Sequence, residues 1–315
     1  MTIAAVLLAY AACVGTLGAR VLGRAGWTAR APLLGIVTYL AAGWSVLAAL
    51  GLAGLTLAVH STALGGGLSH LTGACVLRLR ALYASPGGAT IAGLGLVLAG
   101  AVGARTVLTA FSQLRAARRQ ALRHTQTARL VGHPEPALGA VLVEHPEPAA
   151  YCVSGRHPTV IVTTGALRAL DAGQLDAVLA HERAHLAGRH HRLLAMARIA
   201  GQVLPFLPLM RDADAQVTRL VELHADDAAT RASDPRSLAT ALVVLATGAS
   251  PEPALAAAGG DAVQRIHRLL GPAEQLGRVH RQLLCATAAS LALAPVLLAL
   301  APAVAALALG GVAAA

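Results

Sequence analysis

Four long apolar runs constrain this chain more than any other feature. A helix needs roughly 20 apolar residues to cross the hydrocarbon core of a bilayer, and each run approaches or exceeds that length. The second and fourth are too long and too free of charge for buried helices of a water-soluble protein. The sequence therefore predicts four transmembrane helices, at residues 3–19, 33–59, 89–108 and 283 to about 305.

The composition supports a membrane protein. The chain is 56% hydrophobic with 32 glycines, which excludes an ordinary water-soluble globule and a disordered chain. Its formal net charge of +10 comes from arginine alone, and the arginines flank apolar runs without interleaved aromatics, so direct nucleic-acid binding is not expected. The four cysteines lie far apart and predict neither a disulfide framework nor a thiolate metal cluster. Any metal ligands are therefore expected to be histidines and carboxylates.

The arginines also predict the orientation, because short arginine-rich loops stay in the cytoplasm. They are dense after the first span, after the third and just before the fourth, whereas the loop between the second and third holds only two. Both termini are therefore predicted outside a multi-pass cell-membrane protein, with residues 111–281 inside. The first run has no basic residue ahead of it, so it is predicted to be a retained span and no signal peptide. The arginines used are Arg20, Arg24, Arg30, Arg78, Arg80, Arg115, Arg118, Arg119, Arg123, Arg129, Arg278 and Arg281.

This pattern divides the chain into three parts: a three-span region at residues 1–111, a polar domain at residues 112–282, and a fourth span with a short tail at residues 283–315. The polar domain contains every acidic residue of the chain and eleven of its 13 histidines. Chemistry is therefore expected there.

Local patterns in the polar domain predict a small sheet followed by helices. Residues 140–144, 151–154 and 159–163 are short β-prone runs separated by proline-containing turns. Asp171 can cap a helix together with Gln174, and apolar residues then recur at helical spacing up to Leu186. We expect a mainly α protein with a small sheet of about three strands.

The predicted helix carries the pattern H-E-x-x-H at His181, Glu182 and His185. Residues four apart share a helix face, so both imidazoles can point at one metal ion. The glutamate beside the first histidine can reach a water on that ion. Chance would produce the pattern in only about one such chain in a hundred, so it predicts a metal site. A surface cluster of the same residues is the alternative.

A catalytic zinc site needs a third protein ligand and an open fourth position. Glu222 is the candidate, and Asp226 shares its helix face and can accept a ring N–H from a ligand histidine. A glutamate on an amphipathic helix is more often a solvated charge, but acidic residues are scarce in this chain and these two follow the histidine motif. The apolar stripe of their predicted helix consists of Val217, Leu220, Val221, Ala225 and Ala228.

These residues resemble the gluzincin membrane peptidases, which carry H-E-x-x-H and E-x-x-x-D motifs. Residues 181–185 and then 222–226 (ELHAD) match the two motifs. Residues 159–167 (TVIVTTGAL) are similar to the strand and helix before the motif in HtpX-type and prenyl-protein-type peptidases, and residues 262–270 resemble a helix downstream of the active site. The BlaR/MecR-type regulatory peptidases have a cytoplasmic zinc domain between their third and fourth spans, which is the topology predicted here.

The resemblance implies a zinc metalloendopeptidase with one Zn²⁺ per chain, in a mainly α fold with four transmembrane helices and a cytoplasmic α+β gluzincin-like domain. The metal ligands would be His181, His185 and Glu222, with Asp226 orienting a ligand histidine. Zinc would lower the pKa of its water from near 16 to about 7, and Glu182 would take the proton and pass it to the leaving amine. The implied partners are the lipid bilayer and a cytoplasmic substrate protein of the repressor type.

The resemblance has one departure. Sensors of the BlaR/MecR type carry a penicillin-binding domain after the fourth span, whereas this chain stops at Ala315 and its outer loop at residues 60–88 is short. Binding of β-lactams is therefore not expected. Two other functions stay open: a quality-control peptidase of the HtpX type, and a signal-transducing membrane protein whose zinc is structural and which has no need of Glu182.

Three further expectations concern residues near the motifs. The group that stabilises the oxyanion is not identified, and the available donors His190, His191, His224 and Arg219 are each interpreted as surface or interface residues, as are His145 and His157 in turns. Residues 193–210 are predicted not to cross the membrane, because a crossing would separate the third ligand from the histidines. Residues 159–163 are predicted to be an edge strand that binds substrate as an added strand, and an edge merely covered by a loop is the alternative.

Overall fold

The computed structural model describes residues 2–58, 88–155, 158–247, 259–272 and 276–312, and it is mostly helical. Four helices are long and apolar enough to cross a membrane: α1, α3, residues 90–120 of α5, and residues 278–301 of α13. The four predicted spans therefore all fall on helices, although the end of the second at Val59 and the outer loop with its two arginines lie outside the described residues. The helices are α1 (Thr2–Gly23), α2 (Trp27–Arg30), α3 (Pro32–Ala58), α5 (Gly88–Val131), α6 (Thr164–Ala169), α7 (Ala172–Ala187), α8 (His190–Val203), α9 (Pro208–Ala229), α10 (Pro235–Thr247), α12 (Gly259–Leu270) and α13 (Arg278–Val312).

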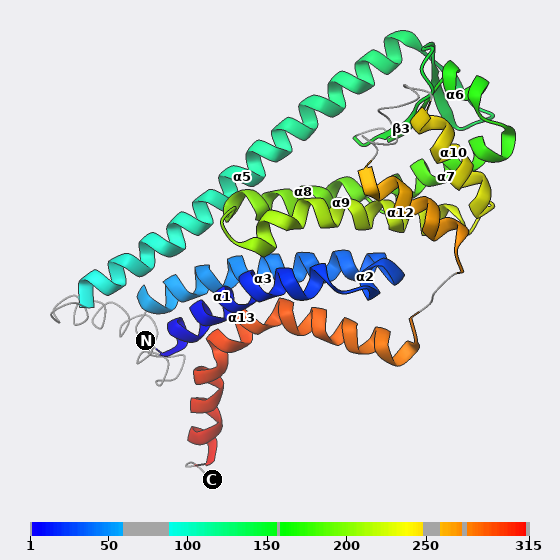
Figure 1. Ribbon diagram of the computed structural model, residues 1–315. Coiled ribbons are helices and arrows are strands. Elements are labelled where there is room, and N and C mark those ends of the chain that lie inside the picture. The colour runs from blue at the N-terminus through cyan, green and yellow to red at the C-terminus, as the bar shows by residue number, and fades with distance from the viewer. Residues whose placement is uncertain (1, 59–87, 156–157, 248–258, 273–275, 313–315) are drawn as a thin grey trace.

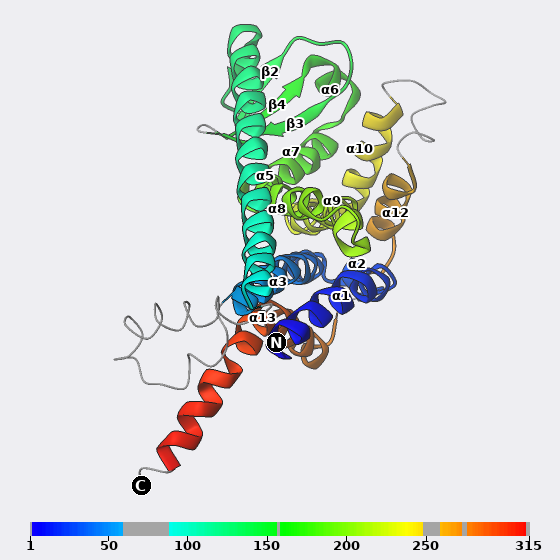
Figure 2. The same ribbon diagram turned by 90° about the vertical axis from the view of Figure 1, so that its left-hand side faces the viewer.

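Helix α3 is the centre of the apolar part of the molecule. It packs against α1, α5 and α13, and also against α8 and α9 of the polar domain. Its side chains Ile36, Tyr39 and Val46 are almost completely buried. Figures 1 and 2 show α1 and α3 lying side by side beneath α8 and α9, with α13 on the far side of them. Hydrophobic burial thus joins the candidate spans and the polar domain into one body.

Helix α5 extends well beyond the predicted third span. It continues to Val131 and reaches the sheet at the opposite end of the molecule (Figure 1). The proposed domain boundary at residues 111 and 112 therefore falls inside one continuous helix, as does the boundary at 282 and 283 inside α13. Arg105, in the third candidate span, donates a hydrogen bond from Nη2 to the carbonyl oxygen of Gln202, at 2.9 Å.

The sheet has four strands in the order β1-β2-β4-β3, one more than expected. The strand β4 pairs with β2 in parallel and with β3 antiparallel, so it lies inside the sheet. The prediction that residues 159–163 form a substrate-binding edge is therefore wrong. The edge nearest α7 is β3. The strands are β1 (Gly132–Glu135), β2 (Ala140–Val143), β3 (Ala150–Val153) and β4 (Thr159–Thr163).

Residues 193–210 do not form one crossing helix. The chain leaves α8 after Val203, turns through residues 204–207, and returns as α9, which starts with a proline at its first helical position. The two helices form a hairpin whose tip packs against α1 and α3, with Leu207 against Gly15 and Met210 beside Gly43 (Figure 1). Because the chain reverses, the end of α9 that carries Glu222 lies near the start of α8. The third ligand candidate is therefore not separated from the two histidines, as predicted.

A close contact between α3 and α5 offers a test of this packing. A methyl group added at Gly54 would lie 2.5 Å from the carbonyl oxygen of Gly95 and 2.7 Å from the backbone nitrogen of Ala99. We therefore expect Gly54→Ala to lower the free energy of unfolding by about 1–3 kcal/mol, the usual cost of overpacking. The measurement is thermal unfolding of the detergent-purified chain.

The matched control is Gly51→Ala in the same helix, where nothing lies within 4 Å of the added methyl group. It should leave the unfolding temperature unchanged or slightly higher, because alanine favours helix over glycine. Equal effects of the two substitutions would contradict the α3–α5 contact.

Candidate metal centre

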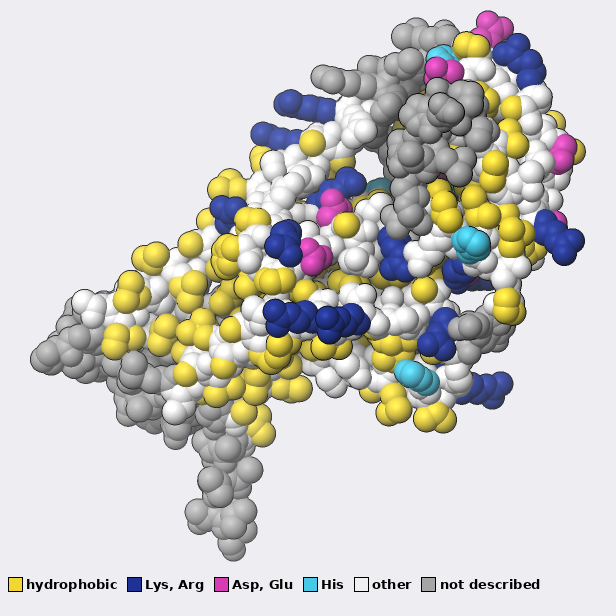
Figure 3. Space-filling view, viewed as in Figure 1, with side chains coloured by type: hydrophobic (Ala, Val, Ile, Leu, Met, Phe, Trp, Pro, Cys, Tyr) yellow, Lys and Arg dark blue, Asp and Glu magenta, His cyan; other side chains and the backbone are white. Residues whose placement is uncertain are grey.

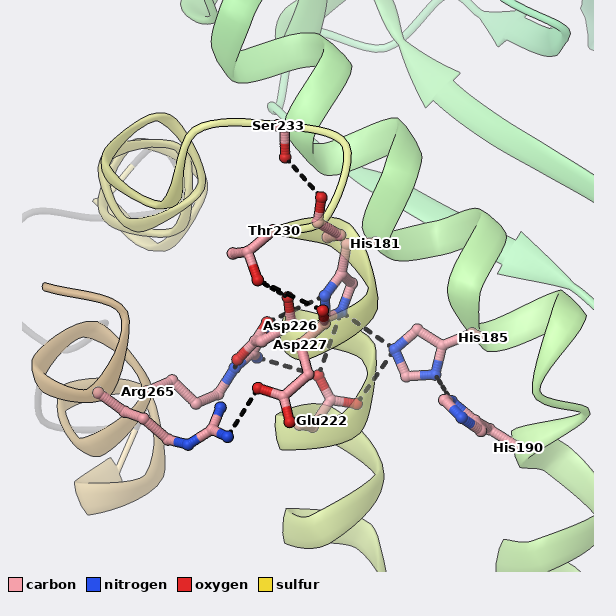
Figure 4. A network of polar contacts seen from close by, with 11 residues as sticks. His181, His185, His190, Glu222, Asp226, Asp227, Thr230, Ser233 and Arg265 are labelled. Carbon is pink, nitrogen blue, oxygen red and sulfur yellow. Dashed lines mark hydrogen bonds and ion pairs between the residues drawn. The ribbon is translucent and has the colours of Figure 1, made fainter. Parts of the chain in front are cut away.

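The helix α7 begins with the predicted capping box. Asp171 Oδ1 accepts a hydrogen bond from the Gln174 backbone N–H at 2.8 Å, and the Gln174 side chain accepts one from the Asp171 N–H at 3.1 Å. This start sets the helix register, so that His181 faces inward at 6% exposure and His185 follows one turn later on the same side. Both imidazoles point towards α9 (Figure 4).

The structure brings His181, His185 and Glu222 together. The two histidine Nε2 atoms are 3.0 Å apart, and each lies 3.5 Å from a carboxylate oxygen of Glu222. One donor atom from each residue lies within 4.8 Å of the others. A tetrahedron with bonds of about 2.05 Å has edges of about 3.3 Å. The separation of the two nitrogens, and the approach of one Glu222 oxygen to each of them, are close to this edge length, so the three side chains can hold one metal ion.

Asp226 and Arg265 support the ligand glutamate and His181. Asp226 is 1% exposed, and its Oδ1 lies 3.0 Å from His181 Nδ1, a close contact whose angle falls short of a good hydrogen bond. Arg265 of α12 donates to both oxygens of Asp226, at 2.7 and 2.8 Å, and its Nη1 lies 2.9 Å from Glu222 Oε2. The planar guanidinium thus fixes two carboxylates one helical turn apart. The role of Arg265 was not predicted, although it lies within residues 262–270, which carry the family resemblance.

The charges around these residues favour a bound cation. Burial alone would raise the pKa values of Glu222 and Asp226, but contacts with His181 and Arg265 outweigh it and lower both pKa values below their usual range. Burial alone would lower the pKa of His181, yet Asp226 and Glu222 raise it to about 9. A field that stabilises an imidazolium also stabilises a divalent cation at the same place. Burial lowers the pKa of His185 to about 4, which keeps this imidazole neutral and able to ligate.

Glu182 lies beside the metal candidates, next to Cys152 of β3. Burial raises the pKa of Glu182 above its ordinary value, against the opposing effects of His181 and Cys152. A raised carboxylate pKa suits a group that accepts and releases a proton near neutral pH. Burial and the neighbouring Glu182 raise the pKa of the Cys152 thiol to about 12. The described residues that could hold a metal ion together are His181, His185 and Glu222, which are histidine and carboxylate donors as expected.

His190 corrects an expectation. It was interpreted as a surface or interface residue, but it is 1% exposed and lies behind the ligand pair, with its Nδ1 2.9 Å from His185 Nδ1 and its Nε2 2.9 Å from His224 Nδ1. Arg189 adopts a left-handed conformation with φ of 49° between α7 and α8, which turns the chain sharply before His190. A methyl group added at Gly188 would collide with the His190 ring, so the glycine makes room for this side chain.

The other candidate donors either lie at the surface, as expected, or contact other side chains. His191 and His145 are exposed. His224 is half-buried beside His190, and Arg219 donates from Nε to the side chain of Gln264 at 2.9 Å. His157 lies outside the described residues. His224 approaches the ligand candidates through His190, which contacts both His224 and His185.

Two histidines four apart on a buried helix, a carboxylate from a second helix and an adjacent glutamate define the class of site found in metallopeptidases. Comparison with known families agrees: residues 113–273, just over half of the chain, match Peptidase family M48. The chain belongs to this family of metal-dependent peptidases. No significant match was found among the curated proteins or among the solved structures.

The contact between His190 and His185 gives a testable prediction. A group that holds the far nitrogen of a ligand imidazole orients that ligand, and its loss typically weakens metal binding about 10–100-fold. We therefore expect His190→Ala to weaken metal affinity by that factor, measured by competition with a chromophoric chelator. The neighbouring exposed His191→Ala is the matched control and should bind as the native chain does. Equal affinities in all three proteins would refute the role of His190.

Proposed function

We propose that this metallopeptidase is a membrane-embedded zinc endopeptidase that cleaves a cytoplasmic protein. The observation that carries the proposal is the convergence of His181, His185 and Glu222, with Glu182 alongside. Histidine nitrogen and carboxylate oxygen are typical zinc donors, and three protein ligands leave one position open for catalysis. Family membership supports hydrolysis of peptide bonds.

Each residue of the site has a separate role in hydrolysis. When bound, zinc acts as a Lewis acid that lowers the pKa of water and polarises a carbonyl. Glu182 takes a proton from the attacking water and later delivers it to the leaving amine. Asp226 holds His181 through its Nδ1, and His190 holds His185. Arg265 keeps Glu222 in place against its charge repulsion with Asp226.

The substrate is proposed to bind along β3. This strand pairs only with β4 among the described strands, and it lies next to the helix that carries Glu182. An extended peptide can add to such an edge through backbone hydrogen bonds. Binding of this kind is largely independent of substrate sequence, so the edge places a peptide bond beside the metal ligands without selecting side chains.

The proposed orientation places the active site on the cytoplasmic side. Arg20 lies at the end of α1, Arg24 in the turn after it and Arg30 at the end of α2, and basic residues favour the cytoplasmic face. This end contacts α12, since Arg268 donates from Nε to the carbonyl oxygen of Ala29 at 3.1 Å. The proposed metal centre lies in the same polar domain. Both termini would then lie outside the cell membrane.

The substrate is proposed to be one regulatory protein of the repressor type, from the likeness of the four-span topology to the BlaR/MecR-type peptidases. A quality-control peptidase of the HtpX type has the same chemistry but many substrates. A third possibility, a signalling protein with structural zinc, gives no role to the half-buried Glu182 beside the ligands. The number of fragments produced in the cell separates the first two functions, and Glu182 separates both from the third.

The test is Glu182→Gln in the full-length chain, expressed in its native membrane. Metal content should persist, while cleavage falls by about 10²–10⁴-fold because the general base is lost. Fragments in the cell are compared by mass spectrometry of new protein N-termini. One substrate that accumulates uncut supports the regulatory function, and many support the quality-control function.

The matched control is Glu144→Gln, the same change at an exposed carboxylate of the polar domain. It should leave the fragment pattern of the native chain intact. If the Glu182→Gln protein cleaves as the native chain does, Glu182 is not the general base. That result would favour a signalling protein with a structural zinc site.

A further inference from the structure

A large pocket lies at the border between the polar domain and the candidate spans. It has a volume of about 1390 Å³, is open on one side, and is formed by α2, the first turns of α3 and α13, and parts of α9 and α12. Figures 1 and 2 show α12 on one side of α2 and the start of α13 on the other. We call it the interfacial pocket.

One end of the interfacial pocket is basic. Four arginines line it against a single acidic residue, Asp227, which pairs with Arg268 at 2.6 Å. Within the described parts of the chain, Arg231 and Arg281 form no ion pair. Guanidinium groups gathered beside an apolar wall attract an anion, and phosphate oxygens accept their paired hydrogen bonds well. The four arginines are Arg30, Arg231, Arg268 and Arg281.

The other end is apolar and belongs to the candidate spans. Leu33 and Val37 of α3 are 48% and 45% exposed, and α13 contributes small side chains, among them Ala288 and Ala292. Helices rise about 1.5 Å per residue, so the wall runs roughly 14 Å along α3 from Pro32 to Ala41 and roughly 16 Å along α13 from Arg281 to Ala292. That depth is about half of a bilayer core of roughly 30 Å, the thickness of one leaflet.

The charge and the depth of the interfacial pocket together indicate which kind of molecule it binds. On the face seen in Figure 3, the acidic side chains lie in the upper part, and the described lower part shows apolar side chains with arginines and a histidine among them. A basic rim above an apolar groove of one leaflet's depth matches a lipid with an anionic headgroup. A zwitterionic headgroup would add a second cation to an already positive rim.

We propose that the interfacial pocket binds one anionic phospholipid of the cytoplasmic leaflet. Its headgroup is bound by arginines of the lining, among them Arg231 and Arg281, and an acyl chain lies along the apolar wall formed by α3 and α13. Arg268 bridges Asp227 to the carbonyl oxygen of Ala29 and so holds α12 against α2 as one wall. The proposal rests on the membrane placement inferred above and is independent of peptidase activity.

The experiment compares lipid retention by the full-length chain in vesicles of phosphatidylcholine, alone or mixed with phosphatidylglycerol. After extraction in mild detergent, native mass spectrometry counts retained lipid per chain. The native protein should retain one phosphatidylglycerol in preference to phosphatidylcholine, and the double substitution Arg231→Gln with Arg281→Gln should reduce that preference by about tenfold or more.

The control removes the same charge from exposed arginines of the polar domain, Arg168→Gln with Arg192→Gln, and should keep the native preference. Equal retention by both double variants would overturn the site. A second arm measures thermal stability with inorganic phosphate alone. Stabilisation by phosphate equal to that by phosphatidylglycerol, and lost in the pocket variant, would overturn the lipid and assign a soluble phosphate compound instead.

Discussion

The pairing of Arg265 with Asp226 and Glu222 is the interaction on which the site depends. Two carboxylates one helical turn apart, one of them 1% exposed, would repel each other and would resist burial without a cation. The guanidinium fork supplies that cation from a separate helix, and removing one partner of such a buried pair commonly costs about 3–5 kcal/mol. With Arg265 in place, one oxygen of Glu222 faces His181 and the other faces His185. The contact with Arg265 thus neutralises the charge of Glu222 and also positions this ligand.

The candidate spans hold the ligand helix from its other side. Along α9, Leu209, Val217 and Leu220 are completely buried against α1 and α3, while Glu222 and Asp226 face α7 on the next turns. A movement of α3 would therefore displace Glu222 relative to the two histidines. The sheet, in turn, is carried by the far end of α5. The catalytic part of the polar domain is thus built onto the apolar helices and is not a separate body.

The sequence predicted local features well and non-local ones poorly. The apolar runs, the capping box at Asp171 and the H-E-x-x-H spacing each depend on neighbours along one helix, so their patterns are visible in the chain. The central place of β4 depends on parallel pairing with β2, and the strand β1 contains Pro134, a residue with low β propensity that pairing with β2 overrides. Arg265 and His190 acquire their roles only when distant helices meet. The extension of α5 was missed because its last turns are polar and rich in arginine.

The central claim is that two imidazoles and one carboxylate hold a zinc ion in the folded chain. X-ray absorption at the zinc edge, on the purified full-length protein, tests it most directly. The account predicts one zinc per chain, with nitrogen and oxygen neighbours at about 2.0–2.2 Å and an imidazole signature that Glu222→Gln weakens. A sulfur neighbour at about 2.3 Å, or a protein that holds no zinc, would contradict it.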